Sequence, residues 1–110
     1  MPPDAGADES TETRLAALPP LVEALQSQDG LEDSPLACGL LAAVALGLVG
    51  DSRGFARDSD TEHALVLREV ARLSDELGLL VVTRTDDRTQ RRFLALSEIG
   101  RALIATKRTG

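Results

Sequence analysis

Six arginines are the side chains whose type and spacing most clearly point to a binding chemistry. Four of them fall within nine residues near the carboxy-terminal end, and two more lie four residues apart upstream: Arg84, Arg88, Arg91 and Arg92, and then Arg68 and Arg72. A guanidinium is planar, always charged and carries five N–H donors, so it binds phosphate oxygens and the acceptor edge of guanine. The cluster indicates a surface that could bind phosphate, or a charged hairpin whose arginines only keep it in solution.

The distribution of charge along the chain agrees with a local contact to phosphate. The net charge is −6, but residues 1–33 carry eight acids against one base, whereas residues 82–110 carry three acids against seven bases. Because phosphate binding depends on the local field, the acidic pI argues against indiscriminate binding more than against a specific contact. Aromatic residues make up 2% of the chain, which leaves no stacking platform for single-stranded nucleic acid. Duplex DNA is the better match.

Other residues that could do chemistry have no matching partners in the sequence. His63 is the only histidine and no serine or cysteine motif pairs with it, while a single cysteine, Cys38, excludes an internal disulfide and cannot by itself form a zinc site. Asp58, Asp60 and Glu62 lack the glycine and the terminal glutamate of a calcium loop. We therefore expect no enzymatic activity, no metal and no cofactor.

The arginine-rich segment has the pattern of a β-hairpin followed by a helix. Residues 81–85 and 92–96 are rich in β-branched, aromatic and apolar side chains, and the turn-forming residues 86–89 separate them. The pattern predicts a two-stranded hairpin whose tip lies within residues 86–89. Ser97 stands where the N-cap of a closing helix belongs, and the helix is expected to bury one stripe. The expected stripe is Ile99, Ala102, Leu103 and Ile104.

The helix before the hairpin carries Arg68 and Arg72. Ser59 and Glu62 have the spacing of a capping box, Gly78 is expected to end the helix, and apolar residues recur between them at helical spacing. The pattern predicts a helix over residues 60–77 with both arginines on its exposed face. These arginines could contact DNA, or they could form local ion pairs with acids three and four residues away.

The amino-terminal half is expected to supply the remaining helices. Residues 1–13 are polar and acidic, without the basic start and apolar run of a signal peptide, and are expected to be a disordered leader. Pro19 and Pro20 predict a helix that starts at the prolines and ends near Ser27. Residues 34–49 predict a buried helix capped by Ser34, too short to span a membrane. Residues 50–58 are expected to form a loop in which Phe55 anchors a shortened helix.

This order of elements resembles the winged helix-turn-helix of the MarR or PadR kind. The resemblance rests on a helix ending at Gly78, a wing with arginines near its tip, and a closing helix that begins Ser-Glu-Ile-Gly-Arg, and it covers residues 59–104 better than residues 34–58. It implies a mainly α fold with a β-hairpin wing, a recognition helix over residues 60–77, and a wing along the minor groove or its phosphates. It also implies that Asp87 braces Arg88.

Two functions follow from this interpretation. In the first, residues 14–110 form a single winged-helix domain that binds double-stranded DNA as a transcriptional regulator in the cytoplasm, as a homodimer joined through residues 20–27 and the end of the closing helix. In the second, the domain is a protein–protein interaction module that does not bind DNA. The arginines of the wing favour the first function, which is our expectation. The short segment 50–58 and the acids near the start of the recognition helix favour the second.

Overall fold

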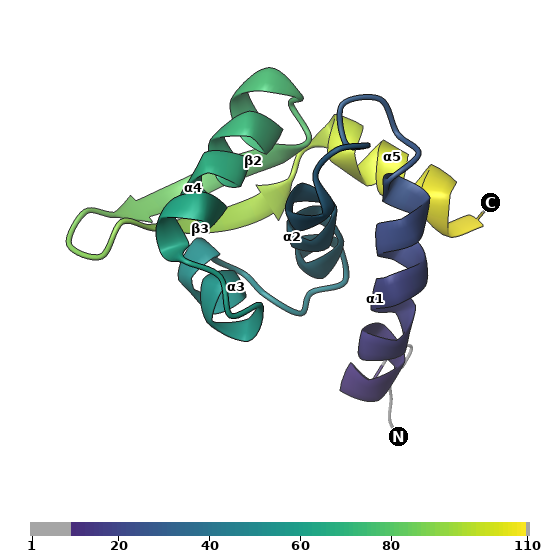
Figure 1. Ribbon diagram of the computed structural model, residues 1–110, viewed down its shortest axis with the longest axis horizontal. Coiled ribbons are helices and arrows are strands. Elements are labelled where there is room, and N and C mark those ends of the chain that lie inside the picture. Colours follow the sequence, from purple (N-terminus) through teal and green to yellow (C-terminus); the bar gives the residue numbers. More distant parts are fainter. Residues whose placement is uncertain (1–9, 110) are drawn as a thin grey trace.

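The computed structural model describes residues 10–109, so most of the expected leader, residues 1–9, lies outside the described part. The elements are α1 (Thr11–Leu25), α2 (Pro35–Ala45), α3 (Ser52–Asp58), α4 (His63–Ala71), a π-helical turn η1 (Arg72–Glu76), β2 (Leu80–Asp86), β3 (Arg91–Leu96) and α5 (Glu98–Thr109). The hairpin projects from one end of the molecule, and α1 and α5 lie at the other (Figure 1). The expected fold class is confirmed: the domain is mainly α with a β-hairpin wing, and its elements follow in the order of a winged helix-turn-helix.

Helix α2 is the centre of the core. It packs against α1, α4, α5 and β3, and its Leu40, Leu41 and Ala42 are fully buried. The chain has so few aromatic residues that leucine side chains supply most of the buried volume, at about 1.5–3 kcal/mol for each one buried. Helix α2 lacks a side chain at Gly39, and the Phe55 ring of α3 lies against this position. No helix among the described residues is long and apolar enough to cross a membrane.

Helix α1 corrects the expectation drawn from the prolines. It begins at Thr11, with the Ser10 side chain accepting a hydrogen bond from the Thr13 amide, and it continues through Pro19 and Pro20 to Leu25. Thr11 to Thr13 therefore belong to this helix. Buried residues beyond the prolines, including Leu25, anchor the second half of the helix in the core. Tertiary packing offsets the hydrogen bonds that two prolines cannot donate.

The expected caps of α2 and α5 are confirmed, and that of α4 is wrong. Ser34 accepts from the Ala37 amide at 3.1 Å, and Ser97 accepts from the Gly100 amide at 2.9 Å. Ser59 instead donates to the carbonyl oxygen of Phe55 at 2.7 Å. Its hydroxyl thus closes the end of α3, and α4 begins at His63 without a side-chain cap.

The segment after α4 ends where the sequence predicts, but α5 buries different residues. Gly78 has a positive φ of 67° after η1, as expected of a residue that ends a helix. In α5, Ile104 is buried and Leu103 is partly buried, but Ala102 is exposed and Ile99 is 65% exposed. Gly100 takes the buried position in the first turn, because the turn lies directly against the backbone of Leu79.

The wing is an antiparallel pair with one irregularity. Leu80 pairs with Leu96 at its base and Asp86 with Arg91 near its tip, and the register shifts between Val82 and Arg84. The tip is therefore formed by residues 87–90, one position later than expected. A further antiparallel bridge joins Asp51, at the start of α3, to Phe93 on β3. This bridge brings α3 alongside the wing.

Candidate nucleic-acid interface

Helix α3 is fastened to the wing by its own arginine and by its cap. The Arg53 guanidinium donates to the Thr89 carbonyl oxygen from both Nε and Nη2, at 3.2 and 3.0 Å. Asp51 accepts from the Gly54 amide at 2.7 Å as the N-cap of α3, and its carboxylate lies 3.6 Å from Arg91 Nε on β3. Because both contacts link the first turn of α3 to the hairpin, the helix and the tip of the wing form one surface.

A buried hydroxyl connects three elements behind this surface. Ser52 is fully buried, and its Oγ accepts from the Arg92 amide at 2.8 Å and lies 2.8 Å from His63 Nε2. Ser52 belongs to α3, His63 to α4 and Arg92 to β3. A serine hydroxyl has one donor and two acceptor positions, so it can satisfy both neighbours at once. The arrangement fixes the first turn of α4 against α3 and the wing.

Three arginines of the wing keep an uncompensated charge, two of them held by a contact and one exposed. Arg84 lies over the Phe93 ring at 4.1 Å, and Arg92 donates to the Gln90 carbonyl oxygen at 2.9 Å. Arg88 is exposed. Ring faces and carbonyl oxygens hold a guanidinium in place without neutralising its charge. The wing therefore presents three oriented or exposed cations.

The aspartate expected to brace Arg88 has a different role. The carboxylate of Asp86 accepts from the Arg88 backbone amide at 3.0 Å, and the carbonyl oxygen of Asp87 accepts from the Gln90 side chain at 2.9 Å. The expectation for Asp87 is therefore wrong: the acidic side chain that shapes the tip is that of Asp86, and it binds backbone. The Arg88 guanidinium is left to face solvent.

The two arginines expected on one helix have different surroundings in the structure. Arg68 is exposed on α4. Arg72 was expected on the same exposed face, but its side chain is 30% exposed, it donates to the Gly30 carbonyl oxygen, and its Nη1 lies 3.7 Å from the Glu69 carboxylate. Arg72 thus ties η1 to the loop before α2. Its guanidinium is occupied by these contacts, whereas that of Arg68 points to solvent.

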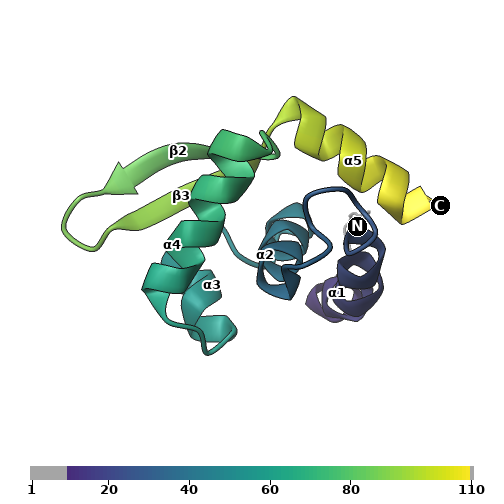
Figure 2. The same cartoon turned by 45° about the horizontal axis from the view of Figure 1, so that its top comes forward.

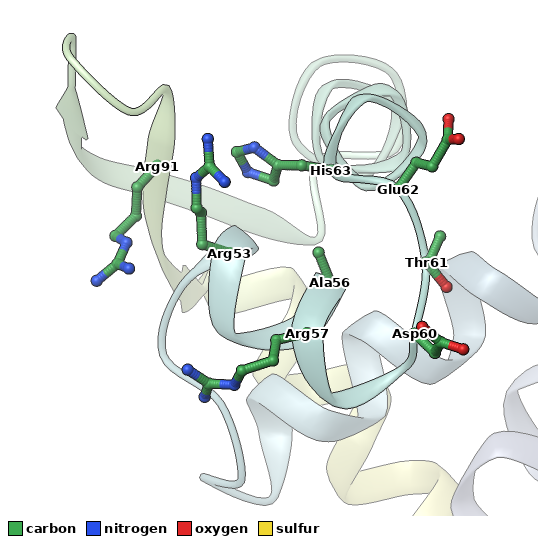
Figure 3. Close-up of a pocket in the computed structure, with 8 residues that line it drawn as sticks. All are labelled: Arg53, Ala56, Arg57, Asp60, Thr61, Glu62, His63 and Arg91. Carbon is green, nitrogen blue, oxygen red and sulfur yellow. The ribbon is translucent and has the colours of Figure 1, made fainter.

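A hollow of about 580 Å³ lies between α3, the start of α4 and β3. In Figure 3 the His63 ring points toward Arg53, and the Arg91 side chain extends from the strand away from the ring, while the Asp60 and Glu62 side chains lie along the turn that precedes α4. Asp60 and Glu62 nevertheless line the same hollow as the arginines, so two carboxylates belong to its surface. Burial lowers the pKa of His63, the charges of Arg53, Arg92 and Arg91 lower it further, and Asp51 opposes them.

Sequence reasoning missed three of the residues that line this hollow. Arg53, Arg57 and His63 line it together with the expected Arg91. A usable signal was the spacing of Arg53 and Arg57, which places them one turn apart once residues 52–58 are helical. Arg57 pairs with the adjacent Asp58 at 3.3 Å, so its charge is partly compensated.

The remaining candidates for chemistry lie in the interior or lack partners. Cys38 is fully buried, its thiol donates to the Leu31 carbonyl oxygen at 3.4 Å, and burial raises its pKa. A thiol in this position is a core residue rather than a nucleophile. Within residues 10–109, no three histidine, cysteine, aspartate or glutamate side chains gather to hold a metal ion.

No family model, no curated protein and no solved structure matches this chain. Function is therefore inferred from the geometry of the surface formed by α3, the start of α4 and the wing.

Proposed function

We propose that this protein is a small DNA-binding protein that acts as a transcriptional regulator in the cytoplasm and has no enzymatic activity. The observation that carries the proposal is the double hydrogen bond from Arg53 to the wing tip, which merges α3 and the hairpin into one basic surface. Uncompensated guanidinium groups at fixed positions bind phosphates with little loss of side-chain entropy. Duplex DNA offers phosphates at regular spacing along such a surface.

The arginines of this surface take different parts in the proposal. Arg88 and Arg92, near the tip, bind backbone phosphates or enter the minor groove, where a narrow negative channel attracts guanidinium groups. Arg84, which lies over the Phe93 ring, adds a third positive charge to this surface. Arg68 is the exposed donor of α4 that can reach a base edge in the major groove. Arg72 is left out, because its guanidinium holds the loop at Gly30.

The test is a salt titration of binding to random-sequence duplex DNA. We expect measurable affinity at low salt and a negative slope of log affinity against log salt. The slope should be smaller by about one unit for each phosphate that the Arg88→Ala, Arg92→Ala double variant no longer neutralises. Lys107→Ala is the control for removal of a positive charge, because Lys107 lies on α5 at the other end of the molecule and donates to Ser27 at 3.3 Å (Figure 1). A double variant with the parent's slope would remove the wing from the mechanism.

A second function is favoured by the acids of the same region. Asp58 is exposed at the end of α3, Asp60 and Glu62 are exposed on the turn before α4, and Asp87 is exposed at the tip of the wing. A surface that alternates in sign is suited to a protein partner with complementary charges. If the parent shows no affinity for duplex DNA even at low salt, where screening is weakest, the domain is this interaction module instead.

We also propose that the protein is a homodimer, since proteins of this architecture commonly bind two symmetric half-sites of DNA. The surface expected from the sequence is partly used within the chain, because Leu21 and Leu25 are buried in the core and α5 packs on α1. A dimer there would use the outer side of α1, where Pro20 is exposed. Sedimentation at tens of micromolar should show the dimer if the dissociation constant is near about 1 μM. A monomer alone would contradict it.

A further inference from the structure

The hollow between α3, α4 and β3 is lined by basic side chains and, on the turn before α4, by the carboxylates of Asp60 and Glu62. The basic side chains outnumber these two acids and could hold one anionic group. They come from separate elements, with Arg53 and Arg57 on α3, His63 on α4 and Arg91 on β3. Arg53 is fixed by the Thr89 carbonyl oxygen and retains its charge, while Arg91 lies beside Asp51. A phosphate group is negatively charged and can accept hydrogen bonds from several N–H donors at once.

His63 holds a special place in this lining because it is fixed at one ring nitrogen. Its Nε2 lies 2.8 Å from Ser52 Oγ, which also accepts the Arg92 amide. The serine hydroxyl has one donor and two acceptor positions, so it pairs with Nε2 in either tautomer of the neutral ring and with the Nε2–H of the imidazolium. Burial and then the guanidinium groups of Arg53, Arg92 and Arg91 lower the pKa of the ring, with Asp51 the opposing charge.

We propose that this hollow binds one phosphodiester group of the DNA backbone, and that His63 takes up a proton when the phosphate binds. The proposal rests on DNA binding as the function of the surface. The phosphate adds negative charge among Arg53, Arg91 and His63, and so offsets the repulsion between the guanidinium groups and a protonated imidazole. The added proton comes from solvent, no covalent bond between heavy atoms changes, and the Nε2–H of the imidazolium then donates to Ser52 Oγ.

The direction of the pH effect follows from linkage. An imidazolium beside a bound phosphate loses its proton less readily than one in the free protein, so the pKa of His63 is higher in the complex than in the free protein. The added affinity is fully present below the pKa of the free protein and is lost as the pH rises through the pKa of the complex. Affinity therefore rises as the pH falls, with a limit of about one proton taken up per phosphate bound.

The experiment measures the affinity of the full chain for one random-sequence duplex between about pH 5.5 and 8.5, a range that brackets the titration of a histidine, at constant ionic strength. We expect binding to tighten by about threefold to tenfold as the pH falls, which corresponds to a fraction of one proton. His63 is the chain's only histidine, so His63→Gln should abolish this dependence while its amide keeps a hydrogen bond to Ser52. Lys107→Ala should keep the dependence of the parent. An equal dependence in His63→Gln would overturn the proposal.

A nuclear magnetic resonance titration of the His63 ring in the parent avoids reliance on the variant's folding. With saturating duplex, the ring should titrate at a higher pH than in the free protein. Inorganic phosphate without DNA separates the two sources of the anion. A shift with the duplex supports the backbone site, whereas a shift with inorganic phosphate alone assigns the hollow to free phosphate and overturns it. Duplex binding that does not depend on pH overturns this proposal and leaves the function standing, and absent duplex binding at any pH overturns both.

Discussion

The two ends of the molecule are stabilised in different ways. At the α1–α5 end, leucine side chains such as Leu21 and Leu25 are buried and the packing is apolar. At the wing end, α3, α4 and β3 are joined by polar contacts through Arg53 and Ser52. Removing side-chain volume from the core should lower the free energy of unfolding. Removing a polar contact at the wing end should instead release the charged side chains from their fixed positions. Figure 2 shows both ends in one view, with α2 between them.

The largest expected effect is a loss of stability on removing volume from the apolar core. Leu41→Ala leaves a cavity in α2 and should lower the free energy of unfolding by about 2–5 kcal/mol. Leu65→Ala is the matched control, because Leu65 is 42% exposed on α4 and its truncation should change stability by about 0.5 kcal/mol or less. Urea unfolding of the two variants measures the difference. Equal losses in both would show that α2 is not the centre of the core.

The next effect concerns the polar side, where one buried hydroxyl joins three elements. Ser52→Ala leaves the Arg92 amide and His63 Nε2 without their partner, so we expect a loss of about 1–3 kcal/mol, measured by urea unfolding. Ser27→Ala removes an exposed hydroxyl and serves as the control. A loss in Ser52→Ala no larger than that of the control would show that the polar contacts do not stabilise the wing end.

The smallest expected effect on stability comes from the contact that holds the wing tip in position. Arg53→Ala removes two hydrogen bonds to the wing tip and should cost about 0.5–1.5 kcal/mol, felt mostly at the tip. Hydrogen exchange should quicken at the amides of residues 88–91, with little change in α2. Arg57→Ala is the matched control on the same helix, because its side chain is 78% exposed and pairs with its neighbour. If hydrogen exchange at the tip is unchanged in Arg53→Ala, the contact between α3 and the wing does not hold the tip in position.

The sequence predicted features that depend on neighbouring residues. Ser34, Ser97 and Gly78 act as caps or stops through contacts within a few residues, and the hairpin follows from local alternation and turn residues. Among the predictions that were wrong, one failed because tertiary packing outweighed propensity, and another because a serine had a second local partner. Helix α1 continues through Pro19, and Ser59 binds the end of α3 instead of capping α4.

The candidate site was predicted only in part for the same reason. The wing arginines are neighbours in sequence, so their clustering was visible. Arg53 and His63 reach the same hollow only because α3 folds against β3 through the bridge between Asp51 and Phe93. Their sequence separation from the wing is large, and no local pattern indicates that contact. The hydrogen bond that holds the Arg72 guanidinium likewise goes to the carbonyl oxygen of Gly30, 42 positions away.

The close approach at Gly100 has a consequence for the variation this chain can tolerate. A Cβ at Gly100 would overlap the carbonyl oxygen of Leu79, which is backbone and cannot swing aside as a flexible side chain would. In a library of all single substitutions, a screen for folded protein alone would therefore retain glycine at this position while leaving Arg88 free to change. If the proposed function holds, a screen for duplex binding would restrict both positions, and the two screens together would distinguish residues that build the domain from residues that bind its ligand.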